Sequence, residues 1–160
     1  MATNKTRMND LIKWADQALQ EQSGHPAPGC SKVLFKRERP EGEDTINESY
    51  NGSVAALGVS IAMGELLPAL AIYYQDKPNS NAKPKANRRS VLDVIARIVT
   101  MDTERRGMDF SEGRKYAYNL FQYALRHAND STLKQEIIDC SIALKHVVRT
   151  YKLVKNEQSS

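Results

Sequence analysis

Basic side chains with the spacing of a helical surface occur near the end of the chain. Lys145, Arg149 and Lys152 occupy positions i, i+4 and i+7, which share one face of a helix. No acidic residue lies between Lys145 and Lys155. Such a row of cations can bind nucleic-acid phosphates without reading the base sequence. A solvated face that keeps the protein soluble explains the same spacing, so the spacing alone favours neither interpretation.

A second group of basic residues lies between Lys77 and Arg106, where eight basic residues accompany three acidic ones. Arg88 and Arg89 come directly before a predicted helix, whose N-terminal end is itself positive. A phosphate group or an acidic partner would relieve this unfavourable placement. The formal net charge of +4 and the sequence pI of about 9.1 are mild, so the clustering is more informative than the total.

Side chains that could perform catalysis are scattered along the chain. The three histidines, His25, His127 and His146, form no His-x-x-x-His pair. The two cysteines match no metal-ligand spacing, and no glycine-rich phosphate loop is present. No histidine follows an arginine at the spacing used by the small helical ribonucleases of the higher-eukaryote-and-prokaryote nucleotide-binding type. We therefore expect no catalytic residue, no metal and no cofactor.

The most apolar stretch of the chain runs from Tyr50 to Asp76. As one helix it would be long enough to span a membrane, but Glu65 would then lie near the bilayer centre, at a cost of about 2.5–3.5 kcal/mol. Gly64 and Pro68 explain more as the junction of two helices, with the proline in the first turn of the second. We expect two buried helices rather than a membrane span.

Helical periodicity dominates the 160 residues, of which 41% are hydrophobic and 26% charged. Possible capping boxes begin at Ser90, Asp109 and Thr132. In the helix after Asp109, Tyr118, Phe121 and Leu125 are expected to point inward. No segment alternates clearly enough to predict a strand. The predicted helices cover about residues 4–22, 47–63, 65–76, 90–101, 109–127 and 132–151.

These elements predict one all-α domain over residues 1–160, a compact bundle of about six helices. Polar segments rich in proline, glycine and asparagine predict mobile loops at about 23–46 and 77–89, and the tail 156–160 should be frayed. The first residues contain no apolar leader, and two distant cysteines suit a reducing compartment. We expect a cytoplasmic protein.

The two apolar helices also carry a family resemblance. A helix containing Tyr50, Leu57 and Ile61 reaches Gly64, and an alanine- and leucine-rich helix follows. This resembles the central helix–glycine–helix stretch in the small subunit of type III-B CRISPR effector complexes, the Cmr family. The last helix, IIDCSIALKHVVRTYKLV, is similar to the terminal helix of that family. The resemblance covers about residues 47–152 and departs from the family pattern at Glu65 and in the longer connections.

The resemblance implies a non-catalytic protein whose copies stack on one another within the effector, beside its other subunits. Basic side chains would help to hold the duplex of guide RNA and target RNA. The expected RNA contacts are Arg88, Arg89, Arg97, Lys145, Arg149 and Lys152, with Lys36 and Arg37 as loop candidates.

Three other classes of function remain open from the sequence. One is a helical adaptor or regulatory module that contacts only protein. Another is a DNA-binding protein of the helix-turn-helix type, for which TERRGMD would be a poor turn. The third is an unrecognised nuclease or transferase.

Overall fold

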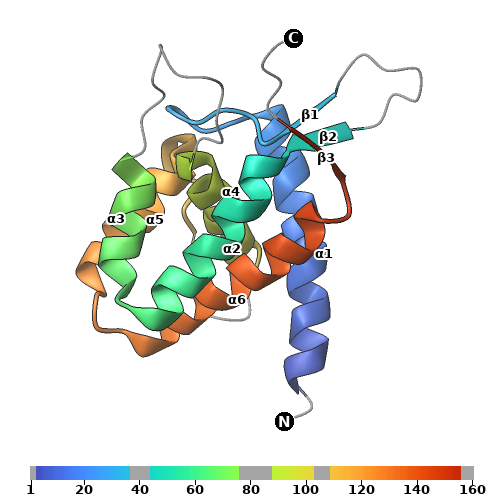
Figure 1. Cartoon of the computed structure of the whole chain (residues 1–160). Helices are drawn as coiled ribbons and strands as arrows, with labels where there is room; N and C mark the ends of the chain where they lie inside the picture. Colours follow the sequence, from blue (N-terminus) through green and yellow to red (C-terminus); the bar gives the residue numbers. More distant parts are fainter. Residues whose placement is uncertain (1–2, 37–43, 76–87, 103–108, 156–160) are drawn as a thin grey trace.

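The fold is that of a computed structural model, which describes residues 3–36, 44–75, 88–102 and 109–155. The predicted loop at 77–89 lies outside these residues except for its last two positions, and the predicted frayed tail lies outside them entirely. The helices are α1 (Thr3–Gly24), α2 (Glu48–Met63), α3 (Leu66–Gln75), α4 (Arg88–Met101), α5 (Tyr116–Arg126) and α6 (Ser131–Val148), and a 3₁₀ turn, η1 (Glu112–Arg114), precedes α5. The predicted all-α bundle of six helices is confirmed (Figure 1).

The apolar run around Gly64 forms two helices, as predicted. α2 ends at Met63 and α3 begins at Leu66, with Pro68 in its first turn. Asn47 caps α2 by accepting a hydrogen bond from the Ser49 backbone N–H. Among the described residues, no helix combines the length and the apolar character needed to cross a membrane.

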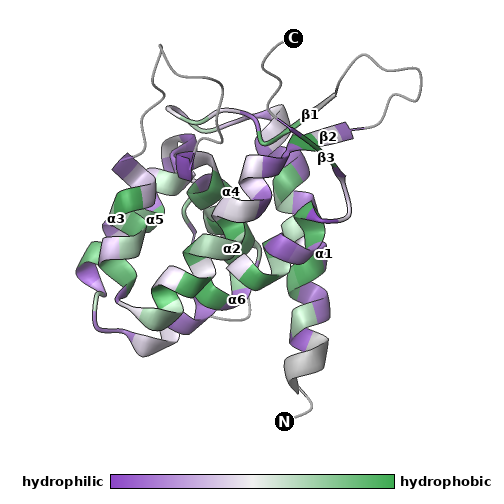
Figure 2. Cartoon of the chain, viewed as in Figure 1, coloured by the Kyte–Doolittle hydropathy of each residue, from purple (hydrophilic) through white to green (hydrophobic). Residues whose placement is uncertain are grey.

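Helix α4 lies at the centre of the bundle and packs against α1, α2, α3, α5 and α6 (Figure 1). Every residue from Ser90 to Val99 is buried, rather than one apolar stripe alone. Figure 2 shows apolar residues concentrated where the helices face one another. Because α4 has neighbours on all sides, its polar side chains must find partners inside the protein.

Three short strands lie at one end of the bundle, where the sequence predicts none. They are β1 (Leu34–Lys36), β2 (Asp44–Asn47) and β3 (Lys152–Val154). β2 occupies the centre of the sheet, antiparallel to β1 and parallel to β3. The prediction of a mobile loop over residues 23–46 therefore misses two strands, and Ala27, Val33 and Ile46 of this segment are buried.

Two predicted helices have different ends in the structure. The last helix stops at Val148 instead of near Tyr151, because the chain turns there and enters β3. The predicted helix start at Asp109 is wrong, since a 3₁₀ turn follows Ser111 and the α-helix begins only at Tyr116. Tyr118 and Leu125 were expected to point inward, yet they are 45% and 47% exposed.

Close contact between α2 and α6 depends on Gly58. A Cβ atom added at Gly58 would lie 2.6 Å from the Ser141 Oγ atom, closer than packed atoms approach. That hydroxyl donates a hydrogen bond to the Ile138 carbonyl, which holds it in this position. A Cβ atom at position 58 would therefore have to displace the Ser141 hydroxyl or separate the two helices.

We predict that Gly58→Ala lowers the free energy of unfolding by about 1–3 kcal/mol, because overpacking outweighs the better helix propensity of alanine. Gly52→Ala in the same helix is the matched control, since nothing lies within 4 Å of its added Cβ. It should stabilise the protein by about 0.5–1 kcal/mol. Urea unfolding measures both changes. Removing the opposing hydroxyl with Ser141→Ala should restore most of the loss, and additive effects would contradict this explanation.

Candidate nucleic-acid interface

The predicted basic row at the end of the chain spans a helix end and a strand. Lys145 lies in the last turn of α6, Arg149 is the C-cap residue, and Lys152 is the first residue of β3. Both Arg149 and Lys152 are exposed. The prediction that all three share one helical stripe is wrong, because α6 ends before Lys152.

Arg149 and Lys152 are held in place by contacts to two other helices. The Arg149 Nε–H donates to the Asn51 side-chain oxygen of α2 at 3.2 Å. Between the two cations, the Tyr151 hydroxyl donates to Asp16 of α1 at 2.6 Å and accepts from Gln20 at 2.7 Å. Burial, followed by the bond to Asp16, raises the pKa of Tyr151 to about 12. These contacts fix the backbone that carries both cations.

A structural role also accounts for part of this row. Cations near the C-terminus of a helix interact favourably with its dipole. Lys145 and Arg149 are both placed to do so at the end of α6. Among the described residues, neither makes an ion pair with a carboxylate.

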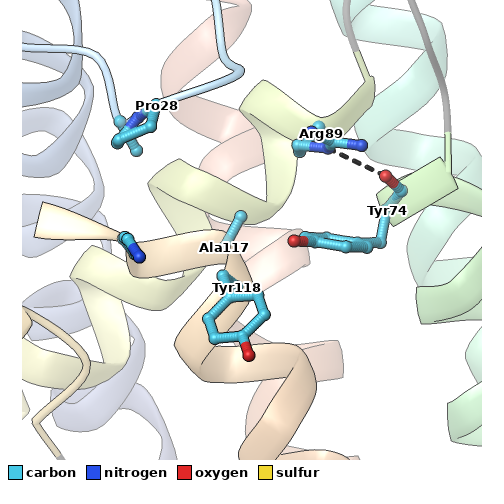
Figure 3. A pocket seen from close by; sticks show the side chains of 7 residues that line it. Pro28, Tyr74, Arg89, Ala117 and Tyr118 are labelled. Carbon is cyan, nitrogen blue, oxygen red and sulfur yellow. Dashed lines mark hydrogen bonds between the residues drawn. The ribbon is translucent and has the colours of Figure 1, made fainter. Parts of the chain in front are cut away.

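Arg88 and Arg89 are in the first turn of α4, and both lie over tyrosine rings of α3. The Arg88 guanidinium is 5.3 Å from the ring centre of Tyr73, and that of Arg89 is 4.4 Å from the ring centre of Tyr74. The Arg89 Nε–H also donates to the Tyr74 carbonyl at 2.8 Å, as Figure 3 shows. This carbonyl belongs to the last turn of α3, where no partner within the helix is available.

The structure thus offers a second explanation for the two adjacent arginines. At the start of α4 they oppose the helix dipole, but the negative end of α3 lies beside them. Arg89 binds that end directly. Neutralisation by a phosphate is therefore not the sole reason for two cations at this position.

A series of hydrogen bonds and neighbouring residues links the cations at the end of α6 to those at the start of α4. Asn51, the partner of Arg149, is next to Tyr50, whose hydroxyl is 3.4 Å from the Ser31 Oγ atom. The Ser31 backbone exchanges hydrogen bonds with the Ser90 side chain, next to Arg89. Both groups therefore lie at the end of the bundle where α1, α3 and α6 finish and α2, α4 and α5 begin. We call it the basic end, and its described cations include Arg88, Arg89, Lys115, Lys145, Arg149 and Lys152.

The basic end also contains acidic residues. Asp44 begins β2, and Glu48 is the exposed first residue of α2. The negative charge of Glu48 also interacts favourably with the dipole at the N-terminal end of its own helix. The surface is therefore mixed in charge around Lys152, which pairs across the sheet with Thr45.

Arg97 does not belong to this surface. Its residue is 4% exposed, and its Nε–H donates to the buried Asp93 carboxylate at 3.0 Å. A second guanidinium nitrogen donates to the His25 carbonyl at 2.7 Å, and the ring of Tyr116 lies 4.2 Å away. A phosphate contact by Arg97 would leave the Asp93 charge buried without its partner, so we withdraw Arg97 from the RNA contacts.

Of the remaining two predicted contacts, the structure describes one. Lys36 is the last residue of that strand, and Arg37 lies outside the described residues. Sequence reasoning missed Lys115, which lies between η1 and α5. The sequence contained a signal for Lys115, since Tyr116 and Tyr118 follow it. A cation can bind a phosphate, and nearby tyrosine rings can stack on bases.

Both cysteines are at least partly buried, and His127 lies against a tyrosine ring. Burial raises the pKa of the Cys30 thiol to about 12, and it also raises that of Cys140. His127 is stacked on Tyr123, with ring centres 4.2 Å apart. Within the described ranges, no three His, Cys, Asp or Glu side chains are grouped to hold a metal ion.

Comparison of the chain with models of protein families, with curated protein sequences and with solved structures found no match.

The buried Asp93–Arg97 pair yields a prediction about stability. Burial raises the pKa of Asp93, and the Arg97 guanidinium opposes that rise. Removing one member of a buried pair leaves an uncompensated charge, so Arg97→Met should lower the free energy of unfolding by about 3–5 kcal/mol. Urea unfolding of this variant, of Asp93→Asn and of the double variant measures the coupling. The double variant should lose clearly less than the sum of the single losses, whereas simple additivity would show that the pair is not coupled.

Proposed function

We propose that the chain is a non-catalytic, RNA-binding subunit of a type III-B CRISPR effector complex. Its basic end would contact the backbone of the duplex formed by guide RNA and target RNA. The partners would be the other subunits, the two RNA strands and further copies of the same chain. Base pairing supplies sequence recognition in such a complex, so contacts to phosphates are sufficient.

The observation that carries this proposal is the gathering of cations from separate parts of the sequence at one end of the bundle. Arg88 and Arg89 come from the start of α4, and Arg149 and Lys152 come from the end of α6. Contacts with α1, α2 and α3 hold these residues on regular elements. Cations held in this way can neutralise neighbouring phosphates.

The shape of the central helices gives further support. The resemblance to the Cmr small subunit rests on two apolar helices joined at a glycine, and α2 and α3 meet at Gly64 in this manner. The first part of the terminal helix of the resemblance, residues 137–148, belongs to α6, which packs along α2, whereas its last residues turn into β3. The two elements that carry the resemblance thus belong to one core.

A helical adaptor that contacts only protein is the second candidate. Three large apolar side chains are exposed on α2 and α3, and Met63 is 84% exposed. Val59 and Met63 are four residues apart and share a face of α2. Such a surface suits contact with protein, including a second copy of the chain, and RNA binding separates the two candidates.

We predict that the chain binds labelled RNA with an affinity that falls steeply between about 50 and 200 mM salt. Arg149→Gln and Lys152→Gln should weaken binding to all RNA sequences alike. Each lost phosphate contact should reduce the slope of log affinity against log salt by about 1. Fluorescence anisotropy titrations at several salt concentrations measure both effects.

Arg126→Gln provides the matched control for this titration. Arg126 is an exposed arginine that ends α5 at the opposite end of the bundle, so its loss changes the net charge equally. This variant should keep the slope of the parent protein. Equal losses in all three variants would indicate attraction by net charge alone, and absence of binding would favour the adaptor.

Membership of a CRISPR effector requires a test in the native cell. A tagged copy expressed at its natural level should co-purify with RNA transcribed from a CRISPR array, and sequencing of the bound RNA measures the enrichment. The double variant Arg149→Gln, Lys152→Gln should lower this enrichment, while Arg126→Gln should not. If no array-derived RNA is enriched, the effector assignment is wrong even if the purified protein binds RNA.

A further inference from the structure

A hollow of about 200 Å³ lies beside Arg89 at the start of α4 and α5. Its wall is apolar on one side and carries two cations, Arg89 and Lys115. In Figure 3, Pro28 lies across the opening from Arg89 and Tyr74, with Ala117 between them and Tyr118 below. The residues that line it are Ala27, Pro28, Tyr74, Arg89, Lys115, Ala117 and Tyr118, none of them acidic.

The start of α5 adds a further positive contribution to this hollow. Lys115 is the N-cap residue, and no side chain caps the helix. The first turn of α5 contains no acidic residue. Helix N–H groups without a side-chain cap attract anions, because their dipoles add a partial positive charge. Two of the residues that line the hollow, Ala117 and Tyr118, belong to this first turn.

Arg89 is fixed at the edge of the hollow. Its Nε–H is bound to the Tyr74 carbonyl, and its guanidinium covers the Tyr74 ring. The Arg89 guanidinium can lie directly beside residue 29 because that residue is a glycine, with a φ of +81°. A Cβ atom there would lie 2.7 Å from the Arg89 Nη1 atom.

Aromatic surface completes the hollow. The Tyr74 ring is stacked on Phe121 at 5.1 Å, so it forms a fixed wall. Tyr118 is the more exposed ring, and the Lys115 ammonium lies 5.8 Å from its centre. Bases stack on tyrosine rings and on guanidinium planes, and both kinds of group line this site.

A second hollow, which Tyr116 lines, lacks this combination. It is lined by Glu21, His25, Arg97, Arg114 and Tyr116. Glu21 carries a negative charge, and Arg97 is already paired with Asp93. The lining of this second hollow thus includes a carboxylate, whereas the lining of the hollow beside Arg89 contains none.

We propose that the hollow between Pro28, Arg89 and Lys115 binds one nucleotide, as a nucleoside monophosphate. The phosphate would lie against Lys115, Arg89 and the start of α5, and the base would pack on Tyr118 and Pro28. The hollow, at about 200 Å³, is smaller than the roughly 300–1,000 Å³ of sites that enclose drug-sized ligands, so it would hold only part of the nucleotide and leave the rest at its open mouth. The nucleotide is either free or the 5′-phosphorylated end of an RNA chain, and only the RNA form rests on the function proposed above.

Calorimetric titration of the intact chain with AMP tests this site. AMP should bind at least about tenfold more tightly than inorganic phosphate or adenosine, since each of these supplies only half of the contacts. Lys115→Gln and Tyr118→Ala should each weaken AMP binding about tenfold or more. Lys115→Arg should retain it, and Arg114→Gln is the control at the adjacent position. Circular dichroism and thermal unfolding establish that each variant is folded.

Two short RNAs that differ only in a phosphate at the 5′ end distinguish a free nucleotide from an RNA end as the ligand of this site. Tighter binding of the 5′-phosphorylated RNA, lost in Lys115→Gln, assigns the site to an RNA end. Equal binding of both RNAs together with AMP binding assigns it to a free nucleotide. The inference is overturned if AMP does not bind, if phosphate binds equally well, or if Lys115→Gln has no effect. In that case RNA binding that still depends on Arg149 and Lys152 would leave the proposed function intact.

Discussion

A charged pair inside the bundle determines how the surrounding segments are arranged. Asp93 and Arg97 lie one turn apart on α4, the helix with neighbours on every side. Asp93 accepts the Ala27 backbone N–H at 3.1 Å, and Arg97 donates to the His25 carbonyl. The backbone after α1 therefore satisfies two charges that could not remain buried alone. Because that backbone is fixed, Gly29 lies beside the Arg89 guanidinium and Pro28 lines the same hollow as Arg89.

The same segment is held at several other points. The Gln22 side chain donates to the Ser31 carbonyl and accepts the Val33 N–H, and the Ser90 hydroxyl binds Ser31. Polar side chains of α1 and α4 thus replace the hydrogen bonds that a helix or strand would supply. An irregular segment can lie against the core because each of these backbone groups has a partner. The basic end consequently has a defined shape although loops form much of it.

Much of the helical framework could be predicted from the sequence, because apolar residues recur with the period of a helix. The junction at Gly64 and the place of Pro68 follow from backbone chemistry alone. The start of α6 is less clear from sequence, since Asp130 caps it and not Thr132. The strands are too short to show alternation, and β3 pairs with a segment far away in the chain. Pairing of this kind depends on the packed helices.

The candidate site was less accessible to prediction, because the sequence gives charge but not burial. Arg97 and Arg89 are both arginines of α4, yet one is enclosed and the other lines a hollow. The signal for Arg97 was Asp93 four residues earlier, a spacing typical of a paired side chain. Lys115 was missed because a search for helical stripes passes over a residue between two helices.

The parallel pairing of β2 with β3 has a consequence for how the chain folds. Thr45 lies beside Lys152, so this ladder joins the two sides of a loop that contains five of the six helices. Closing so long a loop costs chain entropy, and contacts between residues so far apart in the sequence slow the folding of a domain. The packing of α2 against α6 spans a similar length of chain and brings the two strands together. The positions of Arg149 and Lys152 therefore depend on contacts that join the two ends of the chain.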